Sequence, residues 1–162
     1  MWRSRYAPLP DYYAGILWSK LMGSVVLQAT SSDPTLRAYA HCGAEGGGAM
    51  TVLLINLEPT MNRTVTLNSL MSPSDTGGES GGGMLEWHLT GPNGMNATQM
   101  ALNGKLLVAK VVAGGTEYEL PSLEGQPLPL RDGLRADPPV IKLAPASIAF
   151  VQLPTPTGVC SS

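Results

Sequence analysis

The side chains of this chain that could catalyse hydrolysis are scattered, and no spacing groups them. Acid–base cleavage of a glycosidic bond requires two carboxyl groups that face each other across about 5–9.5 Å. The 12 Asp and Glu residues are instead scattered along the chain. We expect solvated surface acids at Glu45, Glu79, Glu86, Glu117, Glu119, Asp132 and Asp137. The residues by themselves therefore assign no catalytic site.

Metal and cofactor motifs do not occur either. The only histidines are His41 and His88, so a multi-histidine metal site is not available, and we expect both to be exposed on strands. The sequence has no phosphate loop or dinucleotide fingerprint. Gly81-Gly82-Gly83 is not followed by the lysine and hydroxyl that cradle phosphate. We expect neither a metal nor a cofactor.

Aromatic side chains offer one weak binding feature. Trp87 beside Glu86 could form a shelf on which a sugar stacks, but we expect core or cross-strand packing there instead. Core packing is also our expectation for Tyr12, Tyr13 and Trp18. An exposed Tyr39 would leave a non-catalytic glycan-binding or protein-binding module as the alternative function.

The two cysteines and the two sequons are informative about the cellular compartment of the protein. Cys42 and Cys160 lie far apart in the sequence and form no metal motif, so they are either two unrelated buried thiols or one disulfide. A disulfide closing so long a loop would stabilise the fold by about 4–5 kcal/mol. The N-glycosylation sequons at Asn62 and Asn96 favour an oxidising, secretory compartment. Residues 1–13, however, contain no apolar core of a secretory signal.

Composition limits the remaining classes of function. A chain of 162 residues suits one domain, or one domain with a fragment of another. Its net charge of −2 provides no basic field for nucleic acid or an anionic membrane. No apolar run is long enough to span a bilayer. These properties indicate a globular protein without a nucleic-acid partner or a transmembrane segment.

One helix is predicted, over Pro8–Met22. Asp11 is the expected N-cap and Gly23 the expected residue after the last turn. Gly15 weakens a helix by roughly 1 kcal/mol relative to Ala, so we expect another element to pack closely against it. Helical spacing relates Tyr13, Ile16, Leu17, Lys20 and Leu21.

The rest of the chain alternates with period 2, which indicates strands. Apolar residues between Pro145 and Pro154 predict a last strand over Ser147–Leu153, which we expect to fill a gap between earlier strands. Asn103-Gly104 predicts a hairpin within Met100–Val108, whereas Ser72–Gly83 is a glycine-rich loop and Leu120–Pro139 a proline-rich extended segment. The other strands are expected at Val25–Ala29, Leu36–Cys42, Met50–Leu57, Asn62–Leu70, Leu85–Thr90 and Val140–Leu143.

About eight short strands and one helix indicate a mainly β fold, an antiparallel β-sandwich preceded by an α-helix. Such a sandwich gives the helix no obvious partner within the domain.

An ordered series of short blocks extends from about Pro8 to Cys160, nearly the whole chain. The blocks are Pro8-Leu9-Pro10-Asp11-Tyr12-Tyr13, Leu17-Trp18, Lys20-Leu21-Met22-Gly23, Val26-Leu27, Leu36-Arg37-Ala38-Tyr39-Ala40-His41-Cys42, Ile55-Asn56-Leu57, Leu102-Asn103-Gly104 and Leu143-Ala144-Pro145-Ala146-Ser147-Ile148-Ala149-Phe150. Taken in this order, they resemble heparanase and the plant heparanase-like proteins.

The resemblance implies a retaining glycoside hydrolase that cleaves glucuronides or chains containing glucuronic acid. In that family a (β/α)8 barrel carries the active site and a β-sandwich follows. Residues 1–23 would then be the last barrel helix and residues 24–162 the C-terminal sandwich, with the helix partners in a barrel not present here. The family's acid/base Glu follows an Asn, and this sequence contains no Asn-Glu pair. Its nucleophile would lie upstream of Pro8, so we expect the chain alone to be inactive.

Further features follow only from the resemblance. It implies a disulfide between Cys42 and Cys160 and one sandwich strand contributed from before the barrel. It also implies a secretory location, such as the cell wall, the extracellular space, the lysosome or the vacuole, with peripheral membrane or cell-wall association. A truncated gene product without an independent role is a third interpretation. In each case we expect marginal stability for the isolated chain, because apolar surface would be exposed.

Overall fold

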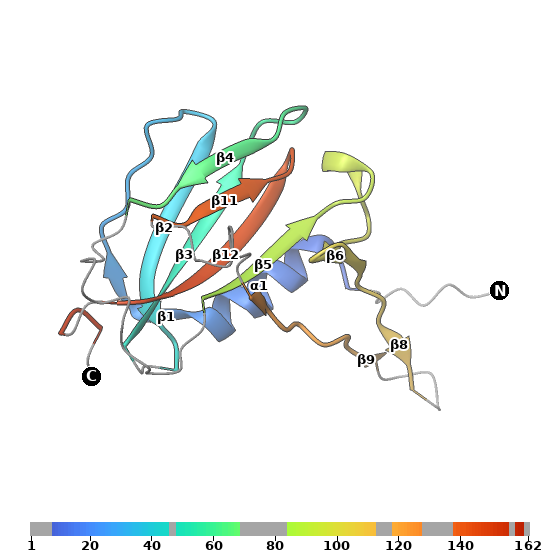
Figure 1. The fold of residues 1–162 in the computed structure, drawn as a ribbon. Coiled ribbons are helices and arrows are strands. Elements are labelled where there is room, and N and C mark those ends of the chain that lie inside the picture. Colours follow the sequence, from blue (N-terminus) through green and yellow to red (C-terminus); the bar gives the residue numbers. More distant parts are fainter. Residues whose placement is uncertain are drawn as a thin grey trace.

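The computed structural model describes residues 8–45, 48–68, 84–112, 118–127, 138–155 and 158–160. In these residues the fold is mainly antiparallel β with a single α-helix, as predicted (Figure 1). The helix is α1 (Pro10–Leu21), and a short 3-10 turn, η2, spans Gly94–Asn96. The strands are β1 (Met22–Leu27), β2 (Leu36–Gly43), β3 (Ala49–Asn56), β4 (Arg63–Thr66), β5 (Leu85–Thr90), β6 (Ala101–Leu102), β7 (Lys105–Leu106), β8 (Lys110–Val111), β9 (Tyr118–Glu119), β10 (Gln126–Pro127), β11 (Val140–Leu143) and β12 (Ser147–Pro154).

The last strand occupies the middle of the large sheet, which confirms that it fills a gap between earlier strands. The sheet order is β1-β2-β3-β12-β5-β6-β7, and β10 pairs with β5. Phe150 of β12 lies opposite Leu53 of β3 on one side and Trp87 of β5 on the other. Since residues 57–84 separate β3 from β5 in the chain, the sheet is complete only after β12 has been added.

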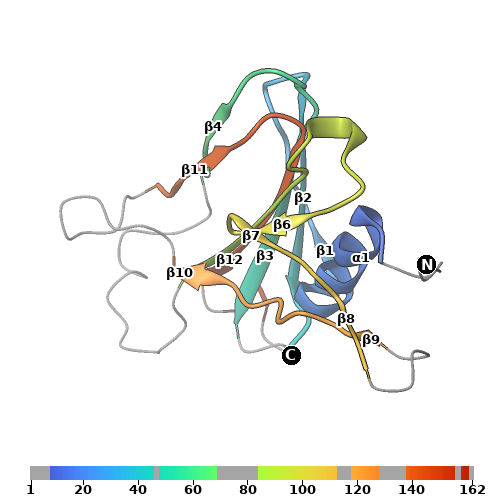
Figure 2. The same ribbon diagram turned by 90° about the vertical axis from the view of Figure 1, so that its right-hand side faces the viewer.

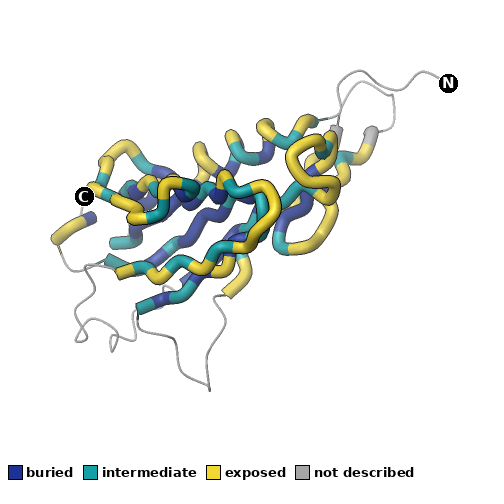
Figure 3. The backbone as a smooth tube through the Cα atoms, turned by 90° about the horizontal axis from the view of Figure 1, so that it is seen from above, coloured by how far each residue is buried: buried dark blue, intermediate teal, exposed yellow. Residues whose placement is uncertain are grey.

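The two faces of the large sheet bury separate clusters of apolar side chains. Alternate residues such as Val52, Leu54 and Val151 point to one face, where the two-stranded sheet of β4 and β11 adds Ile141 and Leu143. Figure 2 shows β4 and β11 on one side of the large sheet and α1 on the other. In Figure 3 the strands of the interior are mostly buried and the loops at the periphery mostly exposed.

The helix has a partner within the chain, contrary to the expectation from a sandwich alone. Tyr13, Leu17 and Leu21 are at most 4% exposed and face the second side of the large sheet. They pack against Leu53, Trp87, Leu89 and Phe150 as members of one apolar cluster. The large sheet itself therefore covers one face of α1.

Both ends of α1 differ from the prediction. Leu9 is the N-cap residue and Pro10 begins the helix, which places Asp11 in the first turn. At the other end the chain passes directly from α1 into β1, so Gly23 is a strand residue. A Cβ atom at Gly23 would lie 2.6 Å from the carbonyl oxygen of Cys42. Gly23 therefore permits close approach of β1 to β2 and does not terminate the helix.

One predicted hairpin and one buried asparagine stabilise the connections between strands. The predicted Asn103-Gly104 hairpin joins β6 to β7, with φ of 49° and 77° at the two turn residues. Asn56, 1% exposed, donates its side-chain amide to the carbonyl oxygens of Met61 and Ala144 and so links two turns. The Ser72–Gly83 loop and residues 128–137 of the proline-rich segment lie outside the described residues. Where the chain is described, no helix is long and apolar enough to cross a bilayer.

Candidate functional site

The outward side of α1 is not covered by any other element of the described residues. This open flank consists of Tyr12, Gly15, Ile16, Ser19 and Lys20, which line a shallow hollow. A Cβ atom at Gly15 would meet no heavy atom within 4 Å, so the close neighbour predicted for Gly15 is not supplied by the described residues. Tyr12 is 49% exposed, which also corrects its predicted place in the core.

Beside the open flank, part of the sheet is not covered by the helix. A hollow of about 310 Å³ lies between Ala14, Gly15 and Trp18 of α1 and apolar residues of the sheet. The sheet residues that line it are Leu53, Ile55, Ile148 and Phe150. Trp18 is 40% exposed at its rim, so the prediction that it lies in the core was wrong. The helix and the sheet together present an apolar surface suited to another folded element.

His41 fastens the end of α1 to the sheet. Its Nδ1 lies 2.6 Å from the carbonyl oxygen of Gly23, and its ring meets the Trp18 ring edge to face at a centroid distance of 5.3 Å. Thr51 adds a hydrogen bond of 2.9 Å from its hydroxyl to the carbonyl oxygen of Leu21. His41 is half-buried by these contacts, which corrects its predicted exposure.

Glu86 is buried, contrary to the prediction of a solvated acid. Its carboxylate oxygens lie 2.9 Å from Nε2 of His88 and 2.9 Å from Nε2 of Gln126. Burial alone raises the pKa of Glu86, but the hydrogen bonds from His88 and Gln126 and the charge on His88 together outweigh it and leave this pKa below its ordinary value. His88 is half-buried because of the same contact. The cluster lies within the fold and fastens β10 to β5.

Trp87 lies in the core, as predicted, beneath a segment from later in the chain. It is 4% exposed, and its Nε1 donates a hydrogen bond of 3.2 Å to the carbonyl oxygen of Leu123. The backbone at Gly125 passes so close to the indole that a Cβ atom there would lie 2.6 Å from the ring. We call Leu123–Gln126 the strap. Because the strap covers Trp87, this residue is not available as a sugar-stacking shelf.

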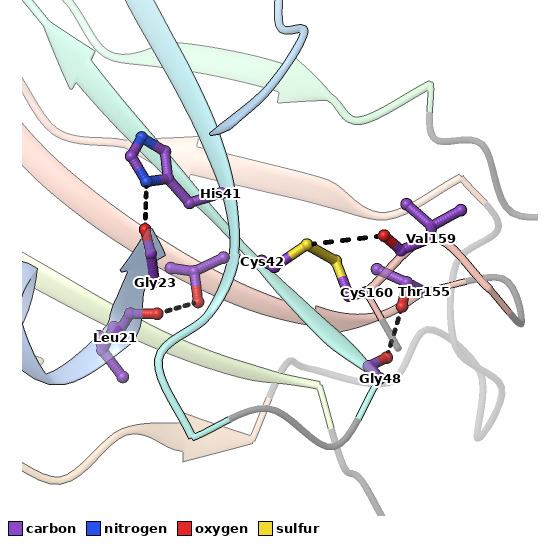
Figure 4. The surroundings of a disulfide bond; sticks show 9 residues. Leu21, Gly23, His41, Cys42, Gly48, Thr155, Val159 and Cys160 are labelled. Carbon is purple, nitrogen blue, oxygen red and sulfur yellow. Dashed lines mark hydrogen bonds between the residues drawn. A yellow bond between two sulfur atoms is a disulfide. The ribbon is translucent and has the colours of Figure 1, made fainter. Parts of the chain in front are cut away.

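The two cysteines are joined at the end of the sheet where α1 meets β1. The sulfur atoms of Cys42 and Cys160 lie 2.07 Å apart, and both residues are buried (Figure 4). Nearby, Thr155 donates its backbone N–H and its hydroxyl to the carbonyl oxygen of Gly48. The tail that follows β12 is thereby tied to β2 and to the start of β3.

Charged groups elsewhere form an ion-pair network. Arg63 lies between two carboxylates, 3.0 Å from Asp33 and 3.8 Å from Glu58. Hydrogen bonds from Thr35, with a smaller contribution from the charge of Arg63, lower the pKa of Asp33. No three His, Cys, Asp or Glu side chains of the described part could jointly hold a metal ion. Glu45 and Glu119 are exposed as predicted, whereas Glu79, Glu117, Asp132 and Asp137 lie outside the described residues.

Two partners of Glu86 were missed by reasoning from the sequence. Gln126 approaches from the strap, and Asn103 accepts the backbone N–H of His88 while donating to the carbonyl oxygen of Glu86. Of the two, only Asn103 had been singled out in the sequence, as part of the Asn103-Gly104 turn. Because the contacts join segments that are distant in the sequence, no local spacing could have revealed them.

The amino-acid sequence matches curated proteins over nearly all of its length. It is 36% identical over 177 aligned positions to "Heparanase-like protein 1" of Arabidopsis thaliana, which covers 94% of this chain and 30% of that protein. It is 32% identical to "Baicalin-beta-D-glucuronidase" of Scutellaria baicalensis, with 94% of this chain and 25% of that protein covered. The chain thus spans less than a third of the length of these relatives. No family model matches it.

The fold has a counterpart among solved structures. The crystal structure of CelM2, a bifunctional glucanase-xylanase from a metagenome library, superposes with a TM-score of 0.50. The superposition covers 91% of this chain and 22% of that one, at 18% sequence identity. At this level of identity the likeness concerns the fold alone.

Proposed function

Since the chain belongs to the heparanase-like family, we propose that it is the C-terminal part of a glycoside hydrolase of that family. Residues 1–23 are assigned to the last helix of a catalytic barrel and residues 24–162 to the β-sandwich domain. The substrates proposed for the whole enzyme are glucuronides and glycans that contain glucuronic acid, with hydrolysis of the O-glycosyl bond. In this assignment the chain positions and supports a barrel that performs the chemistry.

The observation that carries this proposal is the two-sided character of α1. Its inner face, through Tyr13, Leu17 and Leu21, is buried on the sheet, whereas its open flank carries an uncovered Gly15 between Tyr12 and Ser19. A glycine within a helix weakens it by roughly 1 kcal/mol, and close approach of another backbone is the usual compensation. A barrel packed on the open flank would supply that neighbour and would also cover the hollow beside it.

The chain is proposed to lack hydrolase activity when it is alone. The family's acid/base Glu follows an Asn, and no such pair occurs in the sequence. The described carboxylates also lie in an ion pair, in the buried Glu86 cluster or singly on the surface. We place the whole enzyme in the secretory pathway, in keeping with the disulfide, and peripheral association with a membrane or the cell wall belongs to the same proposal.

A chimaeric enzyme tests the proposal. The chain replaces the matching part of the Arabidopsis heparanase-like relative, and hydrolysis of a chromogenic glucuronide is measured for the chimaera and for the chain alone. We expect the chimaera to be active and the isolated chain to be inactive. Gly15→Trp on the open flank should greatly reduce activity of the chimaera, because the indole would occupy the space of the barrel.

Lys142→Trp is the matched control, since Lys142 is exposed on β11, across the large sheet from α1. It should leave activity of the chimaera unchanged. Hydrolysis by the isolated chain at the rate of the chimaera would refute the proposal that the barrel, and not this chain, performs the chemistry. Equal activity of the two Trp variants would refute the position of the barrel on α1.

A non-catalytic binding module is the second proposal, and it rests on Tyr39, which is 46% exposed on β2. The burial of Trp87 removes the other aromatic residue that supported it. Titration calorimetry with glucuronoxylan, arabinogalactan and heparan fragments tests this alternative. Measurable heat that is lost in Tyr39→Ala would support it, and no heat with any of these glycans would dismiss it.

A further inference from the structure

The two sequon asparagines differ in their surroundings from the asparagines that maintain the fold. The side-chain amides of Asn56 and Asn103 form hydrogen bonds with backbone groups of distant segments. Asn62 and Asn96 are exposed instead. The sequon hydroxyls, on Thr64 and Thr98, are exposed as well. Each acceptor is therefore accessible without rearrangement of the core.

Both sequons lie at the same end of the large sheet. Ser147 of β12 pairs with Asn56 at the end of β3, and the next residue, Ile148, pairs with Leu89 near the end of β5. The turns that follow β3 and β5 therefore lie at the same end of the sheet, as Figure 1 shows. Asn62 lies in the connection after β3, and Asn96 lies in η2 after β5.

The disulfide lies at the opposite end of the same sheet. Cys42 is the register partner of Met50, at the start of β3, whereas the connection to Asn62 leaves from the end of that strand. A disulfide buried in a folded domain indicates an oxidising compartment, where N-glycan transfer also takes place. The disulfide thus favours the compartment in which exposed sequons are glycosylated.

Arg63 lies between Asn62 and Thr64 in the sequence, and its side chain contacts another segment. Arg63 directs its guanidinium to Asp33 and to the hydroxyl of Thr35, at 3.0 and 3.1 Å. Its side chain is therefore held by the β1–β2 connection. Asn62 directly precedes β4, which lies on the face of the large sheet away from α1 (Figure 2).

We propose that Asn62 and Asn96 each carry an N-linked glycan. The donor is an oligosaccharide linked to a lipid through a diphosphate. Nδ2 of the asparagine attacks C1 of the first sugar, an Nδ2–C1 bond forms, the bond from C1 to the diphosphate oxygen breaks, Nδ2 loses a proton, and the lipid diphosphate leaves. The glycan on Asn62 lies across the large sheet from the open flank of α1, so it does not compete with an element packed there. This assignment does not depend on the proposed catalytic partner.

The test is expression of the full chain behind a cleavable secretion signal in cultured animal cells. Protein from the medium and from inside the cells is analysed by gel mobility and intact mass, before and after enzymatic removal of N-glycans. Wild-type protein should show two glycan steps. Asn62→Gln and Asn96→Gln should each lose one step, the double variant should lose both, and Thr64→Ala and Thr98→Ala should reproduce the single losses.

Asn68→Gln and Asn93→Gln are matched controls, because both asparagines are exposed but outside a sequon. Each control should keep both steps. Chain retained in the cells reports the same steps, since transfer precedes export. An unmodified wild-type chain with its disulfide formed would overturn the proposal. If the wild-type chain shows only one glycan step, the proposal is overturned for the asparagine whose substitution leaves that step in place.

Discussion

Gln126 donates its side-chain amide to the carboxylate of Glu86 over 2.9 Å and so joins the strap to the middle of the large sheet. The same residue pairs with Glu86 through the backbone, as the start of β10. His88 holds the other carboxylate oxygen at 2.9 Å. A buried acid that is fully hydrogen-bonded in this way stabilises the fold, and removal of its charge should be measurable.

Glu86→Gln should lower the free energy of unfolding at neutral pH by about 1.5–3 kcal/mol, the usual contribution of hydrogen bonds to a charged group. The pKa of Glu86 is lowered in the folded chain. Its contribution is therefore complete above the pKa of an unfolded Glu, about 4.3, and is lost as the pH falls through the lower folded value. Urea denaturation at a series of pH values should show the two proteins converging in acid. A constant difference down to the lowest pH would contradict this assignment.

Gly125→Ala should destabilise the chain by about 1–3 kcal/mol, because the added methyl group overlaps the Trp87 ring and must displace the strap. Tryptophan fluorescence during urea unfolding measures both the stability and the environment of the indole. In a Trp87→Leu background the same substitution should cost much less, since the ring that it meets has been removed. Equal costs in both backgrounds would show that the strap does not rest on Trp87.

Replacing Cys42 and Cys160 with Ser together should lower the free energy of unfolding by about 2–5 kcal/mol, because the unfolded chain is no longer constrained by the long loop. Wild-type protein in a reducing agent should fall to the stability of the double variant. The double variant itself should be unaffected by the reducing agent. A wild-type urea midpoint that does not respond to reduction would be inconsistent with this role.

Gly15→Ala should stabilise the isolated chain by about 0.5–1 kcal/mol, because Ala is the better helix former and its Cβ meets no atom on the open flank. Thermal unfolding of the 162-residue chain measures the gain. In the chimaera with the barrel the gain should disappear or reverse, because the methyl group then meets the packed element. A loss of stability in the isolated chain would mean that another part of the chain already covers Gly15.

Local patterns in the sequence determined the strands and their turns. Alternation of apolar residues predicted β2, with Cys42 facing inward, and Asn103-Gly104 predicted the β6–β7 hairpin. The prolines around Ser147–Leu153 predicted a strand that enters the sheet last, and β12 does so. Such features follow from the period of the backbone and from the conformations open to Gly, Asn and Pro, which depend on neighbouring residues only.

Only the tertiary structure decided the burial of Glu86 and the exposure of Tyr12 and Trp18. Glu86 looked like a surface acid because its partners, His88 and Gln126, act together only when the strap crosses β5. Helical spacing placed Tyr13, Leu17 and Leu21 on one face of α1, and that face is buried. Tyr12 and Trp18 were expected in the core by residue type, but they lie outside that face and are exposed. Burial is a property of what packs on a residue, and those partners come from distant parts of the chain. The alternation of side chains along a strand is written in the sequence, but the choice of side chains that lose contact with water depends on the assembled sheet.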